Sequence, residues 1–204
     1  MLRQCHLEEC NLPDFARPHL ADHHDGMTIL LHWLTALLIV ALFALAEIWE
    51  FLPRGDAQRT LKSLHVSLGV LLILAVLARL LWRAGFARRL PPDPGIMAHA
   101  AEAMHGLLYL LMIVMIVSGP LKTWTTGHGL HVFWLFTIPS PVALPRAWHS
   151  GAGLVHNWAA WAIIGLAGLH ALAAFFHHYA LRDGVLRRIL PGRLTPAVSR
   201  ARGR

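Results

Sequence analysis

Long apolar stretches alternate with short polar segments along the chain. Four of these stretches have about the 20 residues that an α-helix needs to cross the hydrocarbon core of a bilayer. The pattern therefore predicts an all-α fold, an integral membrane four-helix bundle. The predicted membrane-spanning helices are residues 27–46, 64–82, 98–119 and 153–176.

The connection between the third and fourth predicted helices, residues 120–152, is the longest of the connections between helices. Glycines and prolines interrupt it repeatedly, so it cannot form a single helix. Its apolar piece LHVFWLF (130–136) is too short to cross a bilayer. We expect this piece to lie at the membrane interface, where Trp124 and Trp134 are favoured.

Composition supports a single membrane domain. Hydrophobic residues make up 56% of the 204 residues and charged residues only 14%, whereas soluble domains have about 25% charged residues. The formal net charge is +7. However, the basic residues flank the apolar stretches and form no patch with interleaved aromatic residues, which argues against a nucleic-acid partner.

The distribution of Lys and Arg predicts the orientation in the membrane. Thirteen lie on the side of both termini, counting Arg79 just inside the second helix, and five lie on the opposite side. Because cytoplasmic segments carry the excess of positive charge, both termini are expected in the cytoplasm. The predicted organisation is a cytoplasmic N-terminal tail (1–26), a four-helix membrane domain (27–182) and a basic cytoplasmic C-terminal tail (183–204).

The N-terminal tail is acidic, polar and proline-containing, and it lacks the pattern of a secretory signal peptide. It carries several residues of the types that bind zinc, but their spacing matches none of the usual zinc frameworks. A loosely ordered tail is therefore favoured over a zinc site. The residues concerned are Cys5, His6, Cys10, His19, His23 and His24.

Four histidines in the predicted helices fall at two depths. His156 and His170 are fourteen residues apart in the fourth helix, so they share one face and are separated by about 21 Å along the axis. His65, near the outer start of the second helix, matches the depth of His156. His32, near the inner start of the first helix, matches the depth of His170. The sequence thus predicts one outer and one inner pair of histidines.

Ionisable residues inside a membrane are costly and generally mark function. An interhelical hydrogen bond would explain any one of these histidines alone equally well, but their matched depths favour paired ligands. Gly69, one turn from His65, and Gly153, one turn from His156, leave room for a flat group. A b-type haem suits such a pair, and four histidines would hold two haems b. Zinc is less suitable because it requires three or four ligands at one level.

Several longer motifs resemble the bacterial four-helix dihaem cytochrome b561 proteins, within the wider group that includes hydrogenase cytochrome b subunits. The resemblance extends over residues 28–191. Its motifs are LHWLTALL, LHVSLGVLLILAVLARLLWR, HGLLYLLMIVMIVSGPL, FWLFTIP and HNWAAWAIIGLAGLHALAAFFHHYALRDGVLRRILP.

The resemblance places the axial haem-iron ligands on His32, His65, His156 and His170. It also implies electron transfer between a quinone pool and another donor or acceptor. One branch of the family oxidises superoxide to O₂ and reduces ubiquinone, and this superoxide:quinone oxidoreductase activity is the function we expect.

The predicted outer side carries a basic rim that would attract a small anionic donor such as superoxide. Ordinary anchoring to lipid headgroups explains the same charges. Acidic residues in the first of the two outer loops reduce the net charge of the rim. The basic residues of the rim are Arg54, Arg59, Lys62, Lys122 and Arg146.

His105, near the inner end of the third helix, is a candidate catalytic residue. It offers a replacement ligand for His170, a hydrogen bond to a haem propionate, or protons for a quinone bound between the first, third and fourth helices. A simple interhelical hydrogen bond is the alternative.

Three classes of function remain at this point. The first is a self-contained oxidoreductase that passes electrons to ubiquinone. The second is a haem b anchor that relays electrons for a separate dehydrogenase or hydrogenase, and the third is a transporter that uses histidines without haem. The lipid bilayer is a partner in all three, and both a homo-oligomer and a partner dehydrogenase remain open.

Overall fold

The computed structural model describes residues 24–87, 95–182 and 185–190. Four long α-helices contain most of these residues, and a two-stranded hairpin lies between the third and fourth helices. The elements in chain order are α1 (Gly26–Glu50), α2 (Asp56–Gly85), α3 (Ile96–Trp124), β1 (Leu130–Val132), β2 (Phe136–Ile138), α4 (Trp148–Phe176), the π-helix η2 (His177–Leu181) and the 3₁₀-helix η3 (Val185–Arg188).

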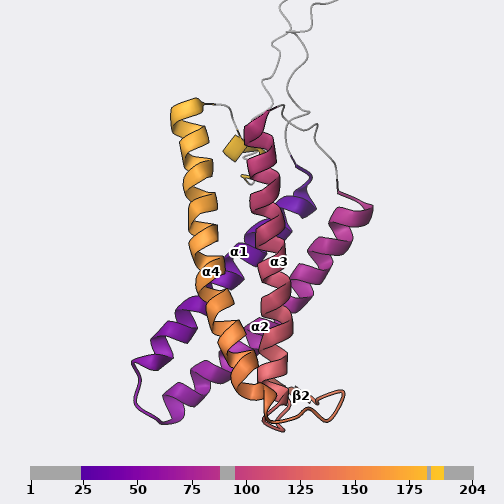
Figure 1. Cartoon of the computed structure of the whole chain (residues 1–204), viewed down its shortest axis with the longest axis vertical. Coiled ribbons are helices and arrows are strands. Elements are labelled where there is room, and N and C mark those ends of the chain that lie inside the picture. The colour runs from indigo at the N-terminus through magenta and orange to yellow at the C-terminus, as the bar shows by residue number, and fades with distance from the viewer. Residues whose placement is uncertain (1–23, 88–94, 183–184, 191–204) are drawn as a thin grey trace, which may run out of the picture.

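The helices pack as two hairpins. α1 packs mainly against α2, and α3 packs mainly against α4. In Figure 1, α3 and α4 run side by side in front, while α1 and α2 cross behind them. The end where α1 begins and α4 ends is called the terminal end here, and the end that carries β1 and β2 is called the hairpin end. An all-α four-helix architecture is thereby confirmed, with the short β-hairpin as an addition.

Each helix begins or ends beyond the apolar stretch that predicted it. α2, for example, starts at Asp56 and includes the polar turn before Leu64, because polar residues at the edge of a membrane do not interrupt backbone hydrogen bonding. A side-chain cap fixes the start of α1. The carboxylate of Asp25 accepts hydrogen bonds from the backbone N–H of Thr28 at 2.9 Å and from its hydroxyl at 2.7 Å, as expected for an N-cap residue.

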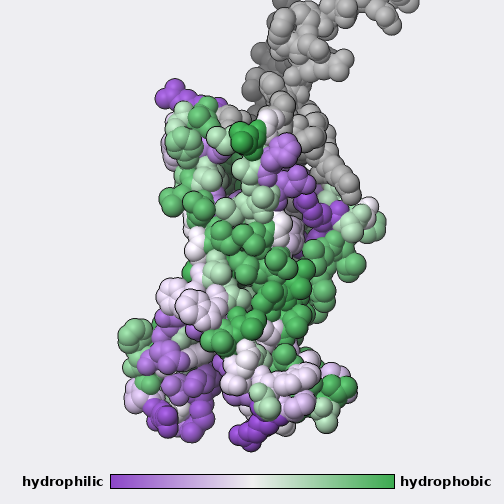
Figure 2. Space-filling view, viewed as in Figure 1, coloured by the Kyte–Doolittle hydropathy of each residue, from purple (hydrophilic) through white to green (hydrophobic). Residues whose placement is uncertain are grey.

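All four helices are long and apolar enough to cross a membrane. Figure 2 shows an apolar middle zone between more polar ends. Large apolar side chains of the membrane-spanning helices are exposed, among them Leu37 at 65% and Leu172 at 65%. Side chains of this kind are stable against lipid tails and unfavourable in water. The protein is therefore a multi-pass membrane protein.

The hairpin is attached to α2 through one buried serine. Phe133 and Trp134 in its turn have positive φ angles of 46° and 58°, a conformation that costs roughly 1–2 kcal/mol for residues other than glycine. Ser67, which is fully buried, accepts a hydrogen bond from the backbone N–H of Phe133 at 2.7 Å. Its hydroxyl donates to the carbonyl oxygen of Ser63 at 2.9 Å, and the carbonyl oxygen of His131 lies 3.3 Å from the same hydroxyl. These bonds hold the strained turn against α2.

The C-terminal segment folds back onto the start of α1. The indole N–H of Trp33 donates to the carbonyl oxygen of Ile189 at 2.9 Å. The backbone N–H of His24 donates to the carbonyl oxygen of Arg188 at 3.2 Å. Partial burial lowers the pKa of His24, although the neighbouring Asp25 opposes this shift. Of the residues considered for zinc in the N-terminal tail, His24 alone lies within the described part of the chain; the others lie outside it.

Candidate functional site

Four histidines from three helices meet in two pairs. The hairpin-end pair is His65 of α2 and His156 of α4, whose ring centroids are 6.4 Å apart. The terminal-end pair is His32 of α1 and His170 of α4, with the same separation of 6.4 Å. All four side chains are half-buried. These are the same two pairs that the depths of the histidines along the predicted helices indicated.

The two pairs lie on opposite sides of the hydrophobic core. This core contains residues from all four helices, near the middle of each. Ile163, for example, is seven residues from both His156 and His170 and is only 3% exposed. A continuous layer of packed side chains therefore separates two distinct sites. The buried members of the layer are Leu38, Leu42, Leu72, Ala75, Val76, Met112 and Ile163.

Both histidines of the hairpin-end pair have a hydrogen-bond partner at Nδ1. Nδ1 of His65 donates to the carbonyl oxygen of Leu42 at 3.0 Å. Nδ1 of His156 lies 3.0 Å from Oγ of Ser118, whose hydroxyl can donate to the carbonyl oxygen of Met115 and so accept from the imidazole. A proton held on Nδ1 leaves the lone pair on Nε2, which is the arrangement of a metal-ligating histidine.

The terminal-end pair has different neighbours. Nη2 of Arg79 donates to Nδ1 of His32 at 3.2 Å, and Nη1 of Arg79 donates to the hydroxyl of Thr35 at 2.8 Å. His105 also reaches this site, with its ring centroid 5.2 Å from that of His170. Three histidines and an arginine therefore meet at the terminal end.

The spacing of the two pairs suits axial ligation of one metal ion by each pair. A metal–imidazole bond is about 2 Å long and the ring centre lies about 1 Å beyond the nitrogen, so two imidazoles on opposite sides of an ion have centres roughly 6 Å apart. Both pairs have this separation. The 5.2 Å between His105 and His170 is shorter, and His105 is the more exposed side chain. Paired imidazoles between apolar helices fit a b-type haem.

A zinc-like site is not supported by the same residues. No group of three or more His, Cys, Asp or Glu side chains in the described residues is arranged to hold a metal ion. The cluster of His32, His105 and His170 does not meet this condition, although its members are close. Zinc sites generally require three or four such ligands.

Glycines shape the space around the hairpin-end pair. A Cβ atom on Gly69 would meet nothing within 4 Å, which agrees with the room predicted beside His65. The space beside Gly153 is occupied by the aliphatic part of Lys122, because a Cβ atom on Gly153 would lie 3.5 Å from Cε of Lys122. Among the glycines of the described residues, Gly119 on α3 lies closest to a histidine. A Cβ atom there would lie 3.2 Å from Cε1 of His156.

The basic residues predicted for the outer rim all lie toward the hairpin end, but in different surroundings. Arg54 and Arg146 are exposed, and Arg59 forms an ion pair with Asp56, which reduces its contribution to a positive field. Lys122 is close enough to His65 and His156 to interact electrostatically with both.

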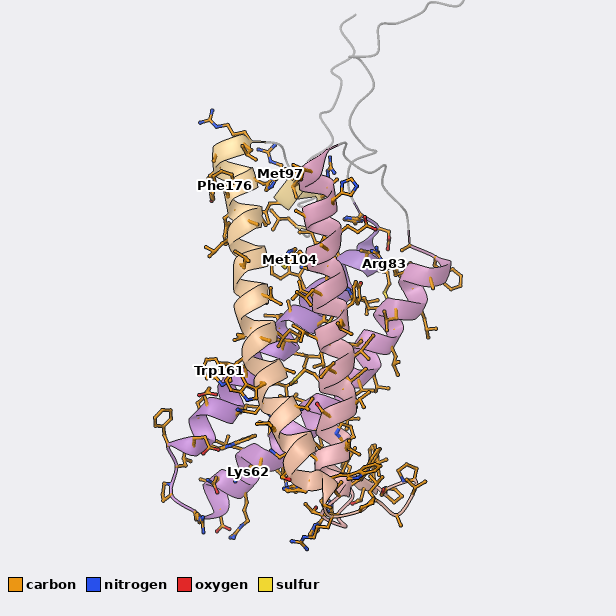
Figure 3. The ribbon with its side chains drawn as sticks, viewed as in Figure 1. Lys62, Arg83, Met97, Met104, Trp161 and Phe176 are labelled. Atoms are coloured by element: carbon orange, nitrogen blue, oxygen red, sulfur yellow. The ribbon has the colours of Figure 1, made fainter. Side chains whose placement is uncertain are left out.

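An aromatic contact connects the hairpin-end pair with a second lysine. The ring of Trp49 lies 4.9 Å from that of His65 in an edge-to-face arrangement, and Nζ of Lys62 lies 5.8 Å from the centre of the Trp49 ring. Figure 3 shows Lys62 and Arg83 near opposite ends of α2. Lys62 and Lys122 are therefore the cations of the rim most closely associated with the histidines.

Arg59 also lines a surface hollow of about 530 Å³ between the start of α2 and the hairpin. His131, Trp134 and Thr137 contribute to its wall, whereas neither histidine of the hairpin-end pair does. This hollow is therefore separate from the histidine pairs.

Sequence reasoning did not identify the partners of the histidines. Ser118 and Gly119 carry no signal in a single sequence, because small residues are common in membrane helices. Arg79 did carry a signal: an arginine inside an apolar span is rare and generally functional. It was counted only as one of the charges that set the orientation.

A family model described as prokaryotic cytochrome b561 matches residues 23–192. The chain belongs to this family. Cytochrome b561 homolog 2 of Escherichia coli (strain K12) is 33% identical over 167 residues, covering 78% of this chain and 86% of the relative. Cytochrome b561 homolog 1 of the same organism is 30% identical over 171 residues, covering 81% and 95%. The probable superoxide oxidase CybB of Yersinia pestis is 27% identical over 176 residues, covering 82% and 96%.

Membership of this family and the four membrane-spanning helices define the general activity. The protein is a membrane cytochrome with b-type haem, and it transfers electrons. A histidine-using transporter without haem is thereby set aside.

Proposed function

We propose that this cytochrome binds two b haems, one at each histidine pair. The observation that carries this proposal is the equal 6.4 Å separation of the two pairs on opposite sides of the packed core. Each bound haem supplies one-electron redox chemistry. His65 and His156 hold the hairpin-end haem, with Leu42 and Ser118 orienting them.

His32 and His170 hold the terminal-end haem in this proposal. His105 would not hold the haem in this proposal, because its side chain is exposed whereas those of His32 and His170 are half-buried. Its exposed position beside this pair instead suits proton delivery to a quinone. We place the quinone at the terminal end, bounded by α1, α3 and α4.

The proposed overall reaction is the oxidation of superoxide coupled to the reduction of ubiquinone. Two superoxide anions each lose one electron and become O₂, and one ubiquinone takes up the two electrons and two protons to become ubiquinol. Similarity to a probable superoxide oxidase supports this assignment. Lys122 and Lys62, beside the hairpin-end pair, supply positive charge that would attract the anion.

The terminal end is proposed to face the cytoplasm of the bacterial cell, and the hairpin end the opposite side of the inner membrane. The excess of Lys and Arg in the segments at the terminal end supports this orientation. Superoxide would then react on the outer side, and the protons for ubiquinone would come from the cytoplasm.

A second candidate is an electron relay for a separate dehydrogenase or hydrogenase. The tip of the hairpin supports it, because Trp134 is 66% exposed and Leu135 is 80% exposed. Apolar side chains at an exposed tip are suitable for contact with another protein. In this alternative the electrons would arrive from the partner enzyme.

The test is a stopped-flow measurement on the purified protein with its haems. Superoxide should reduce the haems rapidly, and added ubiquinone should then reoxidise them. The same protein treated with superoxide dismutase serves as the control and should remain oxidised. Pyridine haemochrome analysis should give two haems per chain. One haem per chain would contradict the two-site proposal, and haems reduced only by a membrane dehydrogenase would favour the relay.

A further inference from the structure

Arg79 lies inside the membrane-spanning part of α2 and points toward the interior of the bundle. It is six residues before the end of the helix at Gly85, so its side chain is long enough to extend to the membrane surface. Instead, Nη1 donates to the hydroxyl of Thr35, which is only 1% exposed. Thr35 lies one turn deeper than His32 along α1. Anchoring to lipid headgroups therefore does not explain the position of this guanidinium group.

Arg79 shares an aromatic neighbour with a second arginine. Cζ of Arg79 lies 5.2 Å from the centre of the Tyr109 ring, and Cζ of Arg83 lies 5.8 Å from the same centre. Among the described residues, no carboxylate forms an ion pair with Arg79. Two like charges beside one ring repel each other, and an anion between them would relieve that repulsion. The two arginines thus form a positive site at the terminal end.

The hydrogen bond between Arg79 and His32 conflicts with haem ligation by His32. A guanidinium group only donates hydrogen bonds, so Nδ1 of His32 must accept. In a neutral imidazole the proton then lies on Nε2. Ligation of iron through Nε2 requires a lone pair on that atom. Arg79 must therefore donate to another acceptor when His32 binds iron.

We propose that Arg79, with Arg83 beside it, binds a propionate carboxylate of the terminal-end haem. A b haem carries two such carboxylates, and the planar guanidinium fork suits a carboxylate. The guanidinium group of Arg79 would then donate to the carboxylate of the haem and no longer to Nδ1 of His32. His32 could then hold its proton on Nδ1 and bind the iron through Nε2. This inference rests on the proposed haem at His32 and His170. It makes Arg79 a positioning residue for that haem.

The test combines a change in the protein with a change in the cofactor. Two proteins are compared, the unaltered protein and the variant Arg79→Gln. Each is loaded either with natural haem or with haem whose two propionates are methyl esters. The measured quantity is the rate at which the terminal-end haem leaves for a haem-accepting protein. That haem is identified by the absorbance lost in His170→Ala. Arg187→Gln removes an exposed charge at the same end and is the control.

Each single change should accelerate loss of the terminal-end haem by about 10- to 100-fold, the usual effect of removing an outer partner of a metal site. The two changes together should be no worse than either alone, because they remove the same contact. Arg187→Gln should have no effect. Arg79→Lys keeps the charge but not the fork, so its rate should lie between those of the unaltered protein and Arg79→Gln.

The proposal would be overturned if Arg79→Gln accelerated the loss of esterified haem by as large a factor as it accelerates the loss of natural haem. The two changes would then act on different contacts. Retention of esterified haem as firmly as natural haem by the unaltered protein would overturn it as well, and this measurement needs no variant. A preparation that binds no haem at the terminal end would instead contradict the proposed function. An anionic lipid at Arg79 in place of the haem carboxylate would leave the rate unchanged on esterification.

Discussion

The two histidine pairs differ in the groups that hold their Nδ1 atoms. His65 and His156 are oriented by a backbone carbonyl and a serine hydroxyl, which leave Nε2 ready to ligate. His32 accepts from Arg79 and is ready only when that donor moves. The hairpin-end site is therefore the more preorganised of the two, and we expect it to bind haem more tightly.

The pairing of the histidines can be tested one residue at a time. His65→Ala and His156→Ala should remove the same haem, and His32→Ala and His170→Ala should remove the other. In each case the haem content should fall to about half, because one missing axial ligand suffices to weaken a bis-histidine site. Low-temperature absorbance spectra distinguish the two haems. Loss of different haems in His65→Ala and His156→Ala would contradict the assignment.

His105 should matter for the quinone and not for haem retention. His105→Ala should keep both haems and their reduction by superoxide, while reoxidation by ubiquinone should slow by about 100-fold or more, as for loss of a general acid. His99→Ala is the matched control, since His99 is an exposed histidine on the same helix. Loss of a haem in His105→Ala would instead make His105 a ligand.

The close packing of α3 against α4 depends on a small residue at one position. Gly119 of α3 lies against the ring of His156 of α4, where an added Cβ would be 3.2 Å from Cε1. Contacts this short require the ring to move. The glycine therefore connects the packing of two helices to the orientation of one imidazole.

A pair of glycine substitutions on α3 tests this connection. Gly119→Ala should shift the absorbance of the hairpin-end haem and weaken its retention by roughly 10-fold, since His156 loses its orientation. Gly106→Ala adds the same methyl group where nothing lies within 4 Å, and it should leave both spectra unchanged. Because alanine stabilises a helix relative to glycine in both variants, helix propensity does not account for a difference. Identical spectra for the two variants would argue against the contact.

The two ends of the molecule differ, because exposed basic residues of the rim lie at the hairpin end, whereas a third histidine, His105, lies beside the terminal-end pair. If superoxide reacts at the hairpin end, its rate should depend on ionic strength. Raising the ionic strength from about 0.01 M to 0.15 M shortens the Debye length from about 30 Å to about 8 Å. The bimolecular rate of haem reduction should then fall by about 10-fold, as steering by exposed charge is screened.

Removing the charges should reproduce the effect of salt. In a triple variant with glutamine at Arg54, Lys62 and Lys122, the haems should be reduced slowly at low salt, with little further salt dependence and both haem spectra unchanged. Arg187→Gln at the opposite end should behave like the unaltered protein. A rate that does not respond to salt would favour electron relay from a partner enzyme.

The periodicity and length of the apolar stretches determined the four membrane helices, because each helix forms its backbone hydrogen bonds within itself and needs no distant partner. Depth along a helix is likewise a local property, so the fourteen-residue interval between His156 and His170 predicted the two levels. The helix ends were less predictable, since polar residues such as those after Asp56 continue a helix at the membrane edge.

Only the tertiary structure decided which groups surround each histidine. The contacts of Ser118 with His156, of Leu42 with His65 and of Arg79 with His32 join different helices. Such contacts depend on how the helices cross and rotate about their axes, which hydropathy does not specify. The β-hairpin between residues 130 and 138 also depends on a distant residue, Ser67, 66 positions before Phe133. Local sequence therefore determined the helices and the depths of the histidines, and packing between helices determined the chemistry around each pair.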